Sequence, residues 1–237
     1  MGFFDFIGEL EYYQGKAPAV PRLNKRYPFV VEDFRDEITG AKVLDLASHD
    51  GCWCYAFAGA GAASMEGIEL RQELVDMFAH YPESNFKHRV NLRQGDIFVE
   101  LEKLVAAGAQ YDVVGVLGIL YHIMDHHRLF VLLKALKPKL IIVDSMFVNH
   151  GGPMIRFSRE RVERLLNSGA HFEGQEKTLV GVPSVAAMDA IAEALEFDIH
   201  WSDWTRLPPD QRQFVGDYYG KGDMQRGTCA LRPMGRG

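Results

Sequence analysis

The sequence predicts an α/β protein with a doubly wound sheet of seven mostly parallel strands and helices on both faces. Three observations support this fold class. Strand-like and helix-like segments alternate along most of the chain, as they do in parallel sheets. The first predicted strand runs into a small polar turn, Ala47–Gly51, which opens an apolar helix. The second predicted strand ends in an acid, Glu69, about 20 residues later, where nucleotide-type α/β sites hold a ribose diol.

Short runs rich in Val, Ile and Leu are the predicted strands. In chain order they are Lys42–Leu46, Ala63–Glu69, Val90–Gln94, Tyr111–Leu117, Leu140–Asp144, Phe197–Trp201 and Gly227–Arg232. Segments with apolar residues at helical spacing separate these runs. The predicted helices are Tyr27–Ile38, Trp53–Ala60, Arg71–His80, Glu100–Ala107, Asp125–Leu136 and Val185–Leu195.

The chain divides into a short N-terminal region and one main domain. Residues 1–40 are predicted to form an arm and a helix, and residues 41–237 form the main domain. Two long segments of that domain, near 146–182 and 205–226, interrupt the alternation of strands and helices. Because long connections at the carboxyl edge of such a sheet often carry function, both insertions are predicted to cover a substrate.

Cationic side chains gather in two of these regions. Arg22, Lys25 and Arg26 lie close together near the N-terminus. They form either a solvated basic turn or a contact to an anionic or sugar substrate, and the sequence leaves both interpretations open. The arginines of the first insertion could contact a sugar, phosphate or carboxylate, and the favoured interpretation places Arg161 and Arg164 on the solvated face of a helix.

Apolar side chains outside the predicted sheet also need burial. Met1–Leu10 is predicted to be a short amphipathic helix or a docking arm, placed over the active site or on another subunit. The second insertion carries Tyr218 and Tyr219 close to Trp204. Such aromatic faces can stack on a sugar ring or pack against the partner in a homodimer.

Composition narrows the class of protein. With 237 residues and a net charge of −6, the chain fits one α/β domain and lacks the basic footprint of a nucleic-acid-binding protein. Its three cysteines do not suggest a disulfide framework. No apolar run reaches about 18 residues, and the N-terminus has no basic region, so neither a membrane span nor a secretory signal is expected. We therefore expect a cytoplasmic protein.

The first strand and its turn read K-V-L-D-L-A-S-H-D-G. This is not the dinucleotide fingerprint G-x-G-x-x-G, because Ala47 and His49 occupy the first two glycine positions. The segment resembles motif I of the class I S-adenosylmethionine-dependent methyltransferases, in which an acid is followed by small residues and glycine. The resemblance implies a Rossmann-like fold, a closing pair of strands near the C-terminus, and S-adenosylmethionine as cofactor.

The resemblance also implies which residues bind the cofactor. The turn would surround the methionine part, the acid after the second strand would accept from the ribose hydroxyls, and the acid of G-D-I would accept from the adenine amino group. The implied residues are Asp45, Ala47, His49, Gly51, Glu69, Leu70, Asp96, Ile97, Leu117 and Gly118. Taken singly, Glu69 is equally a solvated strand end and Asp96 an Asx-type cap. Their order at successive strand ends favours the binding roles.

Candidate catalytic residues follow the fourth and fifth strands. Gly118–His122 reads G-I-L-Y-H and resembles a segment of several small-molecule and tRNA-modifying methyltransferases. Tyr121 and His122 would shape the transfer chamber, with His122 either a general base or a helix-start residue. Asp144 is predicted to hold a divalent ion such as Mg²⁺ or to orient a histidine. His150 is either a base for a hydroxyl or part of an ordinary polar loop.

These histidines favour a hydroxyl as the methyl acceptor, because an alcohol must lose its proton as the new bond forms. The sequence resembles bacterial sugar and natural-product O-methyltransferases, so we expect a small, sugar-like hydroxylated acceptor. The alternative enzyme is a tRNA-wobble-type alkyl or methyl transferase, suggested by G-I-L-Y-H and by V-P-S at Val182–Ser184. A catalytically inactive cofactor-binding subunit is the third interpretation, because the turn lacks the usual glycines.

Overall fold

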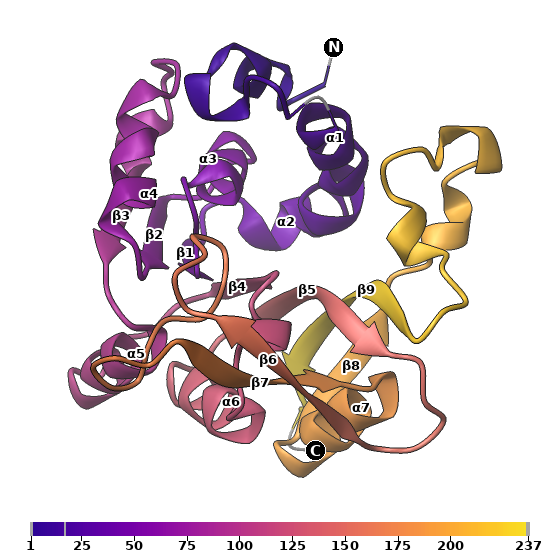
Figure 1. Ribbon diagram of the computed structural model, residues 1–237. Helices are drawn as coiled ribbons and strands as arrows, with labels where there is room; N and C mark the ends of the chain where they lie inside the picture. The colour runs from indigo at the N-terminus through magenta and orange to yellow at the C-terminus, as the bar shows by residue number, and fades with distance from the viewer. Residues whose placement is uncertain (1, 17, 236–237) are drawn as a thin grey trace.

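The computed structural model describes residues 2–16 and 18–235 of the chain, and its centre is a seven-stranded sheet in the order β3-β2-β1-β4-β5-β9-β8 (Figure 1). The strands of this sheet are β1 Lys42–Leu46, β2 Ser64–Glu69, β3 Val90–Gln94, β4 Val113–Leu117, β5 Leu140–Val148, β8 Phe197–Trp201 and β9 Met224–Pro233. All neighbouring pairs are parallel except those of β9, which is antiparallel to both β5 and β8. The predicted fold class is therefore confirmed.

Helices cover both faces of this sheet (Figure 1). The α-helices are α1 Ala19–Val30, α2 Arg35–Ile38, α3 Cys52–Gly59, α4 Gln72–Met77, α5 Ile97–Ala106, α6 His126–Ala135 and α7 Val185–Ala194. Short 3₁₀ helices are η1 Asp5–Glu9, η2 Glu11–Tyr13, η3 Glu32–Phe34, η4 Phe78–His80, η5 Lys87–Arg89, η6 Leu120–His122, η7 Trp204–Arg206, η8 Pro209–Gln211 and η9 Gly216–Tyr218. One apolar core lies under α1–α3, a second lies under α5–α7, and a small third one surrounds Trp204. Among the described residues, no helix combines the length and apolar character needed to cross a bilayer.

Side-chain caps fix where three of the α-helices begin. Asp96 accepts from the backbone N–H groups of the first turn of α5, Asp125 does so for α6, and Ser184 does so for α7. An N-terminal cap satisfies backbone donors that have no partner inside the helix. The caps at Asp96 and Asp125 follow directly on strand ends or turns at the sheet's carboxyl edge, so they also position the loops there.

The predicted helix Tyr27–Ile38 was misplaced. The structure has α1 at Ala19–Val30, followed by η3 and the short α2. Pro18 and Pro21 suggested a loop, but proline is tolerated in the first turn of a helix, where its missing N–H has no helical partner. The basic cluster therefore lies on a helix, not on a turn.

The first insertion holds a β-hairpin that the sequence analysis missed. It pairs β6 Ile155–Arg161 with β7 Lys177–Pro183 in a separate antiparallel sheet. Figure 1 shows this hairpin crossing in front of the carboxyl edge of the main sheet. Arg161 ends a strand and Arg164 lies in the turn that follows, so the predicted helix face was wrong. Most of β6 is exposed, which leaves it without the buried apolar run that marks the core strands.

The N-terminal arm packs on its own chain. Phe4 and Ile7 are fully buried in the core under α3, and the ring of Phe4 meets Trp53 edge-on. Part of the predicted Met1–Leu10 helix is the 3₁₀ helix η1, while Met1 lies outside the described residues. The arm is therefore an integral part of the fold.

The second insertion packs against α1. Trp204 stacks on Phe29 of α1 and on Tyr218, with ring centroids 3.8 Å and 3.5 Å apart. Trp204 and Tyr218 are buried by these contacts. Because their faces are covered within the chain, the predicted sugar-stacking or dimer-contact roles do not apply to these two rings.

Candidate functional site

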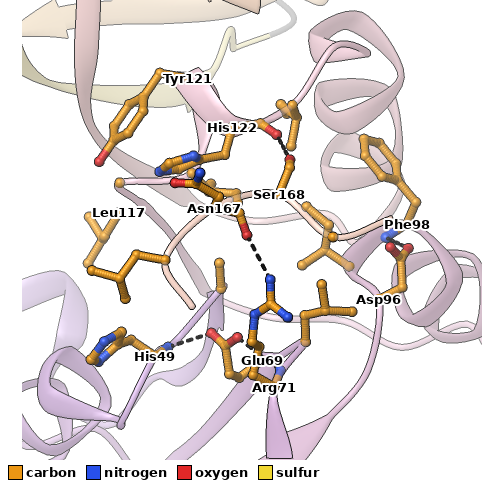
Figure 2. Close-up of a pocket in the computed structure, with 18 of the residues that line it drawn as sticks. His49, Glu69, Arg71, Asp96, Phe98, Leu117, Tyr121, His122, Asn167 and Ser168 are labelled. Atoms are coloured by element: carbon orange, nitrogen blue, oxygen red, sulfur yellow. Dashed lines mark hydrogen bonds between the residues drawn. The ribbon is translucent and has the colours of Figure 1, made fainter. Parts of the chain in front are cut away.

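A cavity of about 730 Å³ lies at the carboxyl ends of the central strands. Open α/β sheets bind ligands at this edge. Figure 2 shows side chains from the ends of β1, β2 and β4 and from the hairpin loop facing one another across it. The predicted site residues that line the cavity are Ala47, His49, Glu69, Leu70, Asp96, Ile97, Leu117, Gly118, Tyr121 and His122. The predicted residues Asp45, Gly51, Asp144 and His150 do not line it.

The turn after β1 carries three left-handed residues. Ala47, His49 and Gly51 have φ values of 54°, 55° and 83°. A Cβ at Gly51 would lie 2.7 Å from Leu92 Cδ1 and 2.8 Å from Phe78 Cδ2, so this position needs glycine for space as well as for conformation. Gly51 therefore shapes the start of α3, and it is not among the residues that line the cavity.

Ala47→Gly is expected to leave the free energy of unfolding unchanged or to raise it by up to about 1.6 kcal/mol. Glycine relieves a left-handed strain of about 1–2 kcal/mol, against about 0.4–1 kcal/mol for its greater freedom in the unfolded chain. The control Ala190→Gly, at an exposed position inside α7, should lower stability by about 1 kcal/mol. Urea denaturation measures both. If both changes lowered stability equally, Ala47 would not be strained by its left-handed conformation.

Glu69 ends β2 and is almost fully buried. Its Oε2 accepts the backbone N–H of His49 at 2.9 Å, and its Oε1 accepts that of Arg71 at 3.1 Å (Figure 2). Each carboxylate oxygen can accept a second hydrogen bond. The backbone donors thus hold the carboxylate in one orientation with accepting capacity left on both oxygens, which suits a pair of vicinal hydroxyls.

Asp96 caps α5 and lies on the cavity wall. Its Oδ1 caps α5 by accepting the N–H groups of Phe98 and Val99 at 2.9 Å and 3.1 Å (Figure 2). Its Oδ2 has no hydrogen-bond partner among the described residues, and the residue lies exposed on the cavity wall. The cap fixes the side chain, and the second oxygen remains an acceptor for a ligand donor such as an amino group.

Asp45 is a correction to the predicted cofactor site. Its side chain is buried behind the turn, facing β4, where a Cβ at Gly115 would lie 2.8 Å from Oδ1. Oδ1 has no hydrogen-bond partner among the described residues, and Oδ2 has a weak contact to the Cys54 thiol at 3.5 Å. Burial raises the pKa of Asp45 to about 8, despite the opposing effect of the Cys54 contact.

Asp45→Asn is expected to abolish part of the pH dependence of stability. The folded-state pKa of about 8 lies above the ordinary 3.8, so the folded protein holds this proton more tightly than the unfolded chain. Its stabilising effect is present below pH 3.8 and is lost as pH rises towards 8, at up to about 1.4 kcal/mol per pH unit. The uncharged isostere removes that slope. Urea denaturation of both proteins across this pH range measures the effect. If the free energy of unfolding changed with pH in the same way for both, the raised pKa of Asp45 would be wrong.

Two tyrosines near the N-terminus hold the motif turn, Ala47–Gly51, by hydrogen bonds. The Tyr13 hydroxyl donates to Asp50 Oδ2 at 2.7 Å, and the Tyr12 hydroxyl lies 3.2 Å from His49 Nε2. His49 Nδ1 lies 2.9 Å from Asp50 Oδ1. Burial acts to raise the pKa of Asp50, but the contacts to His49 and Tyr13 outweigh it and the pKa is lowered. Sequence analysis missed these tyrosines, because nothing local to E-Y-Y-Q marks a contact to a turn 37 residues away.

His122 is held by the hairpin. Its Nδ1 lies 2.7 Å and 2.8 Å from the two carboxylate oxygens of Glu160 on β6. Ser168 donates its backbone N–H to Glu160 Oε2 at 3.0 Å and its hydroxyl to the carbonyl of His122 (Figure 2). Burial acts to raise the pKa of Glu160, but the bonds from His122 and Ser168 lower it overall. An ionised carboxylate only accepts, so Nδ1 carries a proton, and in the neutral imidazole Nε2 is then the nitrogen with the free lone pair.

The same hairpin loop is tied to the end of β2 by Arg71. Its Nε donates to the carbonyl of Leu165 at 3.0 Å, and its Nη2 lies 3.1–3.3 Å from three further carbonyls of the loop. These belong to Val162, Arg164 and Asn167. Figure 2 shows this link between Arg71 and Asn167 next to Glu69. The loop that lines one wall of the cavity is thus fastened beside Glu69.

Asp144 lies in a buried polar cluster, not on the cavity wall. Its Oδ1 accepts from Arg26 at 2.7 Å and Arg226 at 2.6 Å, and its Oδ2 accepts from Tyr218 at 2.6 Å and Thr228 at 2.7 Å. Burial acts to raise the pKa of Asp144, but the two guanidinium charges hold it at about 2.

Four donors occupy the acceptor positions of this carboxylate, so the arrangement does not fit the predicted metal ligand. It does not fit the predicted partner of a histidine either. The described residues contain no group of three or more His, Cys, Asp or Glu side chains placed to hold a metal ion. The site residues thus give no support to the predicted Mg²⁺.

His150 is a second correction. It is exposed in the loop after β5, where its Nδ1 contacts the backbone of Gly152 at 3.0–3.1 Å. It does not line the cavity. The strand β5 continues to Val148, past the predicted end at Asp144, and this extension carries His150 away from the site.

No protein-family model matches the chain, and no curated protein matches its sequence. Solved structures do match its fold. The N-terminal domain of EvdMO1, determined in the presence of SAH and D-fucose, is 20% identical over 90% of this chain and 82% of that chain, with a TM-score of 0.60. An S-adenosylmethionine-dependent methyltransferase from Mesorhizobium loti is 14% identical over 88% and 97%, with a TM-score of 0.62. A DhpI–SAH complex is 17% identical over the full length of both chains, with a TM-score of 0.55.

The chain therefore has the fold of the class I S-adenosylmethionine-dependent methyltransferases. The strand order and the antiparallel β9 agree with the closing strand pair that the motif resemblance implied.

Proposed function

We propose that this protein is an S-adenosylmethionine-dependent O-methyltransferase that acts on a hydroxyl of a small, sugar-like acceptor. The observation that carries the proposal is the His122–Glu160 pair, which places an imidazole with a free Nε2 on the wall of a cavity suited to the cofactor.

The residues present fit the cofactor. Glu69 offers both carboxylate oxygens to the ribose hydroxyls, and Asp96 Oδ2 is free to accept from the adenine amino group. Leu117 and Gly118 line the cavity between this end and the His122 end. A volume of about 730 Å³ lies within the range of about 300–1,000 Å³ that is usual for small-ligand sites.

The bound cofactor supplies a methyl group on a sulfonium, which is already activated for displacement. The chain's own residues then need to align the acceptor, exclude water and remove a proton. His122 Nε2 takes the proton of the acceptor hydroxyl, and Glu160 holds Nδ1 and stabilises the imidazolium. A positioned base of this kind contributes about 10²- to 10⁴-fold to the rate.

The hairpin loop between β6 and β7 supports the covering role proposed for the first insertion. Its residues 165–171 line the cavity, and Arg71 and Ser168 fasten it to the main domain. In the second insertion, Arg226 lines the cavity and the remaining residues do not. A sugar-like acceptor is also favoured by the likeness of the fold to EvdMO1, whose structure was determined with SAH and D-fucose present.

The test is a titration of the full chain with S-adenosylmethionine and SAH, followed by an assay of SAH release with a panel of hydroxylated sugars. We expect both cofactor forms to bind and at least one sugar to be methylated on oxygen, as located by mass spectrometry. Binding without transfer to any sugar or to tRNA would favour the inactive-subunit interpretation. Transfer to tRNA alone would favour the wobble-type alternative. Absence of binding would overturn the proposal.

A further inference from the structure

We propose that the methyl acceptor carries an anionic group, a carboxylate or a phosphate, which Arg26 and Arg226 bind. This inference rests on the proposed function and names the chemical class of its acceptor. Arg26 comes from α1 and Arg226 from β9, and both line the cavity next to Tyr121 and His122.

The two arginines converge because they share one carboxylate. Each donates to Asp144 Oδ1, at 2.7 Å and 2.6 Å. The guanidinium of Arg26 also lies 4.9 Å from the ring centroid of Trp53, and Arg226 Nη2 donates to the Tyr121 hydroxyl at 3.1 Å. Both guanidinium groups are thus held in fixed positions before any ligand arrives.

Two guanidinium groups on this wall share one carboxylate. Arg26 and Arg226 both pair with Asp144, which is fully buried behind them. Asp217 forms a bidentate pair with Arg22, and the buried Nε of Arg226, 3.3 Å from Asp217 Oδ2, has no hydrogen-bond partner among the described residues. The donors of the two guanidinium groups are therefore not all used, in a place where burial strengthens electrostatic attraction.

The hydrogen-bonding groups on this wall are mostly donors. Arg26 donates from Nε to the Tyr218 hydroxyl and from Nη2 to Asp144. Its third nitrogen, Nη1, makes no hydrogen bond to the described residues. The nearby carboxylates, Asp144 and Glu160, already accept from the groups that surround them. A neutral sugar needs acceptors as well as donors, whereas a carboxylate or phosphate needs donors and positive charge. An acceptor with its anionic group on the arginines would turn its hydroxyl towards His122.

The test compares anionic and neutral sugars binding to the full chain saturated with SAH. SAH keeps the cofactor's own carboxylate in place, so any remaining preference belongs to the acceptor site. The probes are D-glucuronate and D-galacturonate for a carboxylate, D-glucose 6-phosphate for a phosphate, and D-glucose and D-galactose as neutral partners. We expect at least one anionic sugar to bind about 10- to 100-fold more tightly than its neutral partner by calorimetry.

Arg226→Gln should abolish that preference, and Arg226→Lys should retain part of it. The matched control is Arg128→Gln, because Arg128 lines the same cavity but pairs with Glu102, away from the acceptor end. The unaltered protein alone can overturn the inference. It would do so if each anionic sugar bound with the same affinity as its neutral partner. If neutral sugars were methylated in that case, the proposed function would stand alone. If SAH did not bind, both proposals would fall.

Discussion

His122→Ala is expected to lower kcat for O-methyl transfer by about 10²- to 10⁴-fold, the contribution of a positioned general base. The affinity for SAH should change little, because the cofactor contacts proposed here come from Glu69 and Asp96 on the other side of the cavity. Turnover assays and calorimetry on the same preparation separate the two effects. The control is His150→Ala, whose exposed ring lies outside the cavity and should leave kcat unaltered.

Glu160→Gln tests the partner of His122. The amide cannot stabilise an imidazolium as a carboxylate does, so kcat should fall and the pH–rate profile should shift, while KM for the acceptor stays nearly constant. A purely structural role of Glu160 would move neither the profile nor kcat in a folded variant.

Full activity of the His122→Ala variant would contradict the role of His122 as the general base.

Glu69→Ala is expected to weaken cofactor binding by about 10²- to 10⁴-fold. The loss corresponds to two charge-assisted hydrogen bonds of about 1.5–3 kcal/mol each. The backbone N–H groups of His49 and Arg71 would also lose their acceptor, which loosens the motif turn. Calorimetry with SAH measures the effect.

Glu66→Gln is the matched control for Glu69→Ala. Glu66 lies on the same strand, β2, but its carboxylate accepts from the Tyr111 hydroxyl and pairs with Lys42 outside the cavity. Its replacement should not alter SAH affinity. If both variants bound SAH like the unaltered protein, the ribose assignment would have to be abandoned.

The main sheet and the placement of Glu69 and Asp96 at its carboxyl edge could be predicted from the sequence, because their signals are local. Strands β3 and β8 begin and end at the predicted residues, and both sit between clear turn and helix patterns. Glu69 and Asp96 could be identified because each ends a strand or opens a helix at the same edge of the sheet. The order of motifs carried this information, although Ala47 and His49 replace the usual glycines.

The acceptor end could not be predicted because its contacts join distant parts of the chain. Glu160 reaches His122 from a hairpin whose strands lack a buried apolar run. Asp144 ends up neutralised by Arg26 and Arg226, which are separated from it by 118 and 82 residues. Asp45 was assigned to the cofactor from its motif position, but its side chain faces β4 and not the cavity. No local pattern reports which way such a side chain turns.

The way in which Arg71 holds the hairpin loop bears on how acceptor specificity can evolve. All its acceptors in the loop are backbone carbonyls, at Val162, Arg164, Leu165 and Asn167. A carbonyl is present whatever the side chain, so substitutions at these positions preserve the tether. Mutations can therefore remodel the loop's side chains over the cavity while its backbone stays anchored. Point substitution is thus the route to a new substrate that keeps this anchor, whereas an insertion or deletion within residues 162–167 would shift the carbonyls that Arg71 holds.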